Sequence, residues 1–91
     1  MKFEFSGALY RFVDYSREVD IPGDTLKEGI DRLVERYPRL QRTLLDQNGQ
    51  VGKSHQLFVN GQQVDRSQRS PADMNMRPDD VVYVLTAITG G

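Results

Sequence analysis

Alternating hydrophobic and polar residues predict two short strands at the start of the chain. Phe3 and Phe5 alternate with polar residues in segment 2–5, and segment 17–21 shows the same pattern. Successive side chains of a strand point to opposite faces, so each segment would bury one face. Segment 6–16 between them is too long for a tight turn and is rich in apolar residues, and we interpret it as the wide connection of a hairpin.

The next segment has the pattern of an amphipathic helix that begins after Thr25. The Thr25 hydroxyl can accept a hydrogen bond from a free amide of the first turn while Glu28 reaches back, which is a capping box. Gly29 costs the helix about 1 kcal/mol relative to alanine, and close packing against the sheet would explain its presence. Pro38 ends the helix, because the residue before a proline avoids the helical conformation, and segment 40–45 predicts a second short helical piece. The apolar face of the first helix has members three or four residues apart: Leu26, Ile30, Leu33, Val34 and Tyr37.

A polar, glycine-rich loop at 46–54 separates the helical region from a predicted hairpin. The apolar segment 56–59 predicts a strand. Asn60-Gly61 is typical of a two-residue type I′ turn, so segment 62–65 would be the partner strand.

The last predicted strand, 81–85, is apolar on both faces, which is typical of a central strand. Segment 66–80 before it is irregular, with Met74 or Met76 expected to fill part of the core. If the last strand lies centrally beside the first, the element order gives a mixed sheet of about five strands crossed by one main helix. This is an α+β architecture of the β-grasp type. Only one main helix is available to cover the sheet, so one face of the last strand has no predicted cover.

Composition and charge narrow the possible functions. The chain has 91 residues, which indicates one small domain with little room for a deep pocket, and this favours a binding or carrier role over an enzyme. Its 12 Lys and Arg against 13 Asp and Glu give a net charge of −1, which argues against nucleic acid as the main partner.

There is no cysteine, and His55 is the single histidine, so thiolate or multi-histidine metal sites are excluded. No apolar run approaches a membrane helix and no signal peptide is recognisable, so we expect a cytoplasmic protein.

The sequence ends in Gly90-Gly91. Two residues without a Cβ can pass through a channel too narrow for side chains and leave a carboxylate at the tip. We expect residues 1–86 to form the β-grasp domain and residues 87–91 a flexible tail. The alternative explanation of the two glycines is a frayed or truncated chain end.

The whole chain resembles the ubiquitin-like sulfur carriers of the MoaD/ThiS superfamily. These include the small subunit of molybdopterin synthase, the thiamin sulfur carrier, and the thiocarboxylate carriers of cysteine and siderophore biosynthesis. The closest match is to the last group: Gly-Asp-Thr-Leu at 23–26, Val-Asn at 59–60, and the ending Asp-x-Val-x-x-Leu-x-Ala-x-x-Gly-Gly at 80–91.

The resemblance implies a mechanism centred on the Gly91 carboxylate. A ubiquitin-activating-type enzyme binds ATP with magnesium, and the carboxylate attacks the α-phosphate to give an acyl-adenylate and pyrophosphate. A sulfur donor then displaces AMP and leaves a thiocarboxylate, from which a downstream synthase takes the sulfur. Some members carry extra C-terminal residues that a metalloprotease removes. The chain itself has no phosphate-binding loop and cannot assemble a catalytic triad, so we expect a protein-sized substrate with no bound cofactor.

Alternation along the strands predicts the surface that meets the activating enzyme. If Val82 and Val84 face the core, Tyr83 and Leu85 face outward, as does Phe58 on the neighbouring strand. Such an apolar patch usually marks an interface, and the ubiquitin-like family uses this face of the sheet. The alternative is that these residues pack under loops. Leu9 and Phe12 in the first connection are expected to extend this patch. The tail residues expected to contact a partner are Ile88, Thr89 and Gly90.

Several polar residues have both a catalytic and a structural interpretation. His55 could be a general base or ligand, but a solvated or hydrogen-bonded residue at a strand start is the simpler reading. Asp79-Asp80 could be an acid–base pair, but a turn before the last strand is simpler. Arg66 and Arg69 are read as solvated loop charges. Four arginines could bind phosphate but are read as a solvated helix face beside Asp31 and Glu35: Arg32, Arg36, Arg39 and Arg42.

Two other functions stay open on the sequence alone. The chain could be a protein modifier that is conjugated through Gly91 to lysines of other proteins, and the product would then be a lysine adduct rather than a free thiocarboxylate. It could also be a plain β-grasp interaction or RNA-binding domain whose function does not depend on Gly90-Gly91. The receiving pathway, whether of the cysteine, siderophore, thiamin or molybdopterin type, is not determined.

Overall fold

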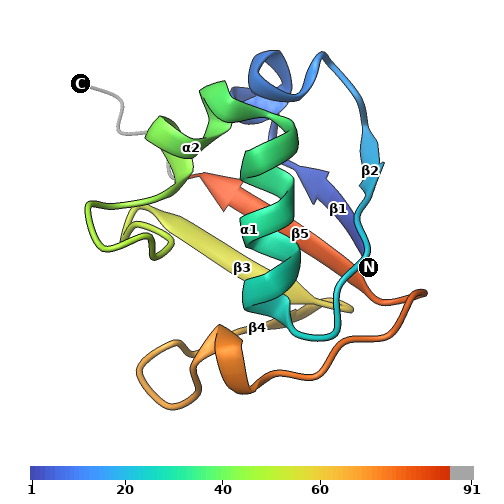
Figure 1. Ribbon diagram of the computed structural model, residues 1–91, viewed down its shortest axis with the longest axis vertical. Helices are drawn as coiled ribbons and strands as arrows, with labels where there is room; N and C mark the ends of the chain where they lie inside the picture. The colour runs from blue at the N-terminus through green and yellow to red at the C-terminus, as the bar shows by residue number, and fades with distance from the viewer. Residues whose placement is uncertain (87–91) are drawn as a thin grey trace.

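A five-stranded mixed sheet with two helices on one of its faces makes up the structure, a computed structural model that describes residues 1–86 (Figure 1). The strand order is β2-β1-β5-β3-β4, with β1 and β5 parallel and the other neighbours antiparallel. The last strand therefore lies centrally beside the first, which confirms the predicted β-grasp arrangement. The strands are β1 (Lys2–Phe5), β2 (Glu18–Asp20), β3 (His55–Val59), β4 (Gln62–Gln63) and β5 (Val81–Thr86). The helices are α1 (Leu26–Arg36) and α2 (Pro38–Leu44), with 3₁₀ helices η1 (Gly7–Val13) and η2 (Pro71–Asp73).

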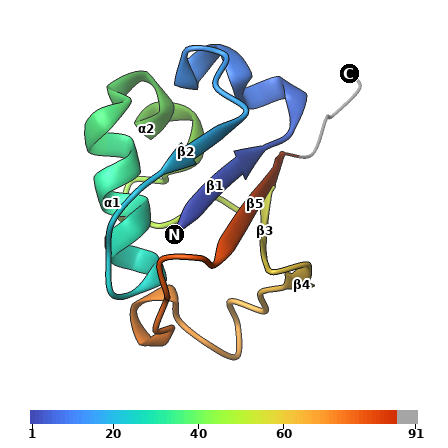
Figure 2. The ribbon, with the colours of Figure 1, turned by 90° about the vertical axis from the view of Figure 1, so that its right-hand side faces the viewer.

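The core lies between the sheet and α1. Figure 2 shows both helices on the same side of the sheet, and within residues 1–86 no helix covers the other side. Side chains of the three central strands point to the helices and are fully buried: Phe3, Phe5, Leu57, Val82 and Val84. The α1 residues that meet them are Leu26, Ile30, Leu33 and Val34. The predicted apolar stripe is therefore the buried face of α1 apart from Tyr37, which follows the helix and is half-buried.

The predicted N-cap of α1 is confirmed. The Thr25 hydroxyl accepts a hydrogen bond from the Glu28 amide at 3.1 Å. The Glu28 carboxylate pairs with Arg32 at 2.8 Å rather than closing a capping box. Close packing at Gly29 is also confirmed, but its neighbour is Met1, whose Sδ would lie 2.3 Å from an added Cβ.

The first connection differs from the wide hairpin loop that the sequence predicted. It contains η1, which buries Leu9 and Val13 four residues apart. The chain then turns through Asp14 and Tyr15, both with positive φ, 54° and 58°. Leu9 and Val13 therefore belong to the core, with Tyr10 and Phe12 packed against it, and this explains why a loop of its length is rich in apolar residues.

The β3–β4 hairpin has the predicted turn but a shorter second strand. Asn60 and Gly61 have φ of 50° and 85°, as a type I′ turn requires. The second strand ends at Gln63 rather than at residue 65, although the Val64 amide still bonds to the Leu57 carbonyl and the Val64 side chain is buried.

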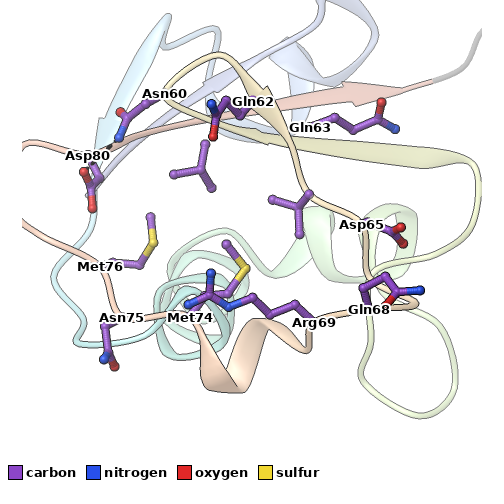
Figure 3. Close-up of a pocket in the computed structure, with 12 residues that line it drawn as sticks. Asn60, Gln62, Gln63, Asp65, Gln68, Arg69, Met74, Asn75, Met76 and Asp80 are labelled. Atoms are coloured by element: carbon purple, nitrogen blue, oxygen red, sulfur yellow. Dashed lines mark hydrogen bonds between the residues drawn. The ribbon is translucent and has the colours of Figure 1, made fainter.

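Segment 66–80 is irregular apart from η2, and both of its methionines fill space against the core. Figure 3 shows Met74 and Met76 beneath the hairpin, and both are half-buried. The backbone here bonds to the start of α1, with the Leu26 amide donating to the Met74 carbonyl.

Candidate functional site

The site begins at the end of β5, where the described part of the chain stops. Thr86 is the last residue of β5 and precedes the predicted tail directly. Ile88, Thr89, Gly90 and Gly91 lie outside the described residues, so their expected roles stay predictions.

Three apolar side chains on the open face of the sheet form what we call the sheet patch: Phe58, Tyr83 and Leu85. Phe58 and Tyr83 stand opposite each other on β3 and β5, with ring centroids 6.2 Å apart. Leu85 lies two residues further along the same face and is 38% exposed, a large fraction for leucine. All three line one shallow hollow of about 500 Å³ together with Glu4 of β1. The predicted facing of β5 is confirmed, and the contact with a partner stays a prediction.

Polar groups border the sheet patch on both sides. Glu4 pairs in register with Tyr83, and beyond it the outer strand carries Glu18, which lies 3.5 Å from Lys2. On the opposite side the Gln63 amide donates to Gln56, which is paired with Leu85. The arrangement is an apolar centre with a carboxylate edge and an amide edge, as is common for interfaces between proteins.

The expectation that Leu9 and Phe12 extend the sheet patch is wrong. Leu9 is fully buried in the core. Phe12 is half-buried and lies beside α2, where it lines a hollow with Pro38 and Arg39. The physical reason is η1: its helical turn directs Leu9 to the covered side of the sheet instead of continuing the alternation of a strand.

Hydrogen bonds hold the end of β5 in place, and we call the four residues that form them the tail root: Ser6, Thr43, His55 and Thr86. The Thr86 amide donates to the Ser6 hydroxyl at 3.1 Å. The Thr86 hydroxyl lies 3.0 Å from His55 Nδ1, and His55 Nε2 lies 2.7 Å from the Thr43 carbonyl. His55 is only 3% exposed. The structural interpretation of His55 as a hydrogen-bonded residue at a strand start is confirmed, although the ring is buried rather than solvated.

Arg66 is not the solvated loop charge that the sequence suggested. Its guanidinium donates to three backbone carbonyls, those of Val51, Gly52 and His55, at 2.7, 3.3 and 2.6 Å. It therefore ties the 46–54 loop to the start of β3. A lone arginine after a short strand gives no sequence signal for this role, since its acceptors are backbone atoms.

The turn interpretation of Asp79-Asp80 is confirmed at Asp80. Its carboxylate accepts from the Asn60 side chain at 2.9 Å, as Figure 3 shows, and from the Arg77 amide at 2.7 Å. These hydrogen bonds, that of Asn60 first, hold the pKa of Asp80 below its ordinary value. Asp80 therefore joins the hairpin to the start of β5 as an ionised group.

The arginines of the helical segment are exposed, as a solvated face requires. Arg32 pairs with Glu28, and Arg36 lies over the Tyr37 ring at 5.5 Å. Arg39 and Arg11 lie on the Phe12 ring at 6.0 and 4.9 Å. Phosphate binding by these residues stays untested.

Two further hollows of the surface are open to solvent. The hollow of Figure 3, about 450 Å³, lies between the hairpin and segment 68–76 and is lined mostly by amides and the two methionines. A hollow of about 580 Å³ lies between α1 and the loops around residues 50 and 70, with Lys27 and Lys53 at its rim. Within residues 1–86 no group of three or more His, Cys, Asp or Glu is placed to hold a metal ion. No helix in this part of the chain is long and apolar enough to span a membrane.

Comparisons with solved structures place the fold among small ubiquitin-like proteins. The crystal structure of the Amycolatopsis orientalis BexX/CysO complex matches with a TM-score of 0.81 and 18% identity over 99% of this chain and 98% of that one. Mycobacterium tuberculosis CysO matches with 0.79 and 21% over 96% and 98%. SAMP1 from Haloferax volcanii matches with 0.79 and 21% over 100% and 98%. At these identities the similarity establishes the fold.

The family follows from the sequence. A search of curated proteins gave no match. The model of the ThiS family, however, matches residues 4–91, which is nearly the whole sequence and includes Gly90-Gly91. Together with the β-grasp topology, this shows that the chain belongs to the ThiS family, within the ubiquitin-like sulfur carriers of the MoaD/ThiS superfamily.

Proposed function

We propose that this protein carries sulfur as a thiocarboxylate on Gly91. A partner enzyme of the ubiquitin-activating type uses ATP and magnesium to adenylate the Gly91 carboxylate, and pyrophosphate leaves. The sulfur of a donor then attacks the carbonyl carbon, AMP leaves, and a biosynthetic synthase takes the sulfur from the thiocarboxylate. Where further residues follow Gly91 in the cell, a metalloprotease first exposes the two glycines. The protein itself is the substrate of these steps and binds no cofactor.

One observation carries this proposal: the central strand β5 presents the sheet patch and continues within five residues to Gly90-Gly91. A partner that docks on Leu85 therefore meets a chain whose last glycine is at most about 20–22 Å away along an extended backbone. The family match supports the role of the two glycines. The complex of CysO with BexX in Amycolatopsis orientalis supports the idea that a carrier of this fold acts while bound to a partner protein.

Intact-protein mass spectrometry tests the proposal. The purified chain is incubated with the candidate activating enzyme, ATP, magnesium and sulfide. We expect a product in which one oxygen of the chain is replaced by sulfur, and no product when ATP is omitted. A chain that stays unmodified with every activating enzyme encoded beside its gene would contradict the proposal.

Replacing Gly90 by valine tests the role of the tail in the same assay. The branched Cβ would obstruct a channel that must close on bare backbone, so we expect loss of most adenylation, measured by pyrophosphate release. Ala87→Val places the same side chain three residues earlier and serves as the matched control. Normal adenylation of Gly90→Val would contradict the threading argument.

A second candidate function is protein modification. SAMP1 from Methanosarcina acetivorans, named as a small archaeal modifier protein, matches with a TM-score of 0.81 and 16% identity. Both functions require activation of Gly91, and the product separates them: a free thiocarboxylate supports the carrier, whereas an amide bond to a lysine of another protein supports the modifier.

A further inference from the structure

We propose that His55 and Thr86 form an anchor that fixes the point at which the tail leaves the domain, and that efficient adenylation of Gly91 depends on it. The inference rests on the proposed function, since it assigns positioning residues for that reaction.

Thr86 is held from both neighbouring strands. β5 lies between β1 and β3 in the sheet. The backbone amide of Thr86 donates to Ser6, which follows β1, and its hydroxyl bonds to His55, which begins β3. The strand end nearest the tail is therefore fixed by side-chain hydrogen bonds beyond the regular ladder.

The hydrogen bonds that run from Thr86 through His55 to Thr43 have one consistent direction. The Thr43 carbonyl can only accept, so His55 Nε2 carries the proton and donates across 2.7 Å. In the neutral ring Nδ1 then accepts, and the Thr86 hydroxyl donates to it across 3.0 Å. The ring thereby connects the tail root to the last turn of α2, whose terminal carbonyls lack partners within the helix.

The His55 ring has little freedom to move. His55 is 3% exposed, and an added Cβ at Gly52 would lie 3.5 Å from its Cδ2. The backbone carbonyl of His55 accepts from Arg66 at 2.6 Å, while its amide donates to Gly52 at 3.2 Å. A buried ring with both nitrogens bonded is a rigid support for Thr86.

Such an anchor matters because the reacting atom lies only five residues beyond it. If Thr86 detaches, the reactive end gains freedom even when the domain stays docked, and a displacement of about 1 Å can cost up to a hundredfold in rate. Since the sheet patch is untouched, the loss should affect the rate of the bound complex more than its formation.

Four variants of the full chain separate positioning from general stability. Thr86→Val removes the hydroxyl at constant size, and Thr86→Ser retains it. His55→Gln places its amide near the position of Nε2 and keeps the bond to Thr43, whereas His55→Asn places its amide near Nδ1 and keeps the bond to Thr86. Adenylation of each is followed by pyrophosphate release with varied carrier concentration, and melting temperatures are recorded beside it.

We expect Thr86→Val and His55→Gln to lower kcat about tenfold with little change in KM for the carrier. Thr86→Ser and His55→Asn should restore most of that rate. Equal kcat for Thr86→Val and Thr86→Ser would overturn the inference. Adenylation rates that fall in the order of the melting temperatures, whichever hydrogen bond a variant keeps, would overturn it as well. If the unaltered chain is not adenylated at all, the proposed function itself fails, so the two failures are distinguishable.

Discussion

At the scale of single residues, the sheet patch depends on side chains that alternate with core residues along β5. Val82 and Val84 are fully buried, while Tyr83 between them is half-buried and Leu85 is 38% exposed. Substitution on the outward positions should therefore affect binding without affecting the fold.

Leu85→Glu tests this separation. We expect the melting temperature to change little and binding to the activating enzyme to weaken about 10- to 150-fold, because burial of a leucine at an interface contributes about 1.5–3 kcal/mol. Titration calorimetry measures the affinity. Tyr15→Glu is the matched control, since Tyr15 is 74% exposed and lies away from the sheet patch, between η1 and β2. Unfolding of Leu85→Glu, or wild-type affinity, would contradict the assignment of the patch.

Asp80 should make stability depend on pH in the acid range. Its folded-state pKa is lowered by the Asn60 side chain and the Arg77 amide, so the folded protein favours the ionised form. The resulting stabilisation is present above the ordinary aspartate value of 3.8 and is lost as pH falls through the lowered folded-state pKa. We expect the difference in free energy of unfolding between the wild type and Asp80→Asn, measured by urea denaturation, to shrink below about pH 4.

The matched comparison uses Asn60→Gly, which keeps the positive φ of the turn and removes the main donor to Asp80. In the Asn60→Gly background, Asp80→Asn should change the pH dependence of the free energy of unfolding less than it does in the wild type. If Asp80→Asn leaves this pH dependence unchanged in both backgrounds, the contact between Asn60 and Asp80 does not cause the loss of stability in acid.

At the scale of elements, α1 is positioned by the fit between Gly29 and Met1. An added Cβ at Gly29 would lie too close to Met1 Sδ and Cε, and the Met1 side chain is itself buried. An alanine at this position would therefore require the buried Met1 thioether to shift within the core.

Gly29→Ala should consequently destabilise the protein. Alanine favours the helix by about 1 kcal/mol, but overpacking of a core costs about 1–3 kcal/mol, so we expect a net loss of about 1 kcal/mol in urea denaturation. Gly7→Ala is the control, because nothing lies within 4 Å of an added Cβ there, and its stability should stay equal or rise slightly. Stabilisation by Gly29→Ala would mean that Met1 moves aside at little cost.

The sequence predicts those elements whose signal is local. The Thr25 cap, the stripe of α1, the Asn60-Gly61 turn and the apolar segment of β5 each contain their own signal, and the structure confirms them. Segment 6–16 carries no such signal, because a 3₁₀ helix that buries residues four apart lacks the repeat of a strand or a long helix. Alternation therefore gives the wrong side of the sheet for Leu9, which is buried in the core.

The tail root shows a different limit of sequence reasoning. His55 and Thr86 meet only through the register of β3 and β5, which pairs Phe58 with Tyr83 and therefore His55 with Thr86. The sequence pattern predicts that Phe58 and Tyr83 face outward on neighbouring strands but does not give the register that pairs them, so it cannot reveal the contact of His55 with Thr86. Arg66 could not have been assigned, since it bonds to backbone carbonyls of a loop whose course the sequence does not determine.

At the scale of the whole molecule, the sheet is held together by pairings between distant parts of the chain. β1 and β5 are the central parallel pair, and β3 borders β5 on its other side. β4 has two residues, both exposed, and lies at the edge.

Amide hydrogen exchange should reflect this layout. We expect amides of β5 that bond within the sheet to exchange only through global unfolding, so that their protection free energy equals the free energy of unfolding. Amides near β4 and η2 should exchange through local opening and show lower protection. Protection in β5 well below the global value would contradict the central role of the strand.

The late position of β5 in the sequence also has a consequence for folding. Without β5 the sheet separates into β2–β1 and β3–β4, and an isolated two-stranded pair is at best marginally stable in water. Pairing of the first strand with the last is a non-local step of the kind that slows folding. Since Phe58 and Tyr83 become neighbours only when β5 is paired, an unfolded chain bears the two glycines but not the patch. A partner that requires both would thus activate folded molecules selectively, which would make docking a form of quality control.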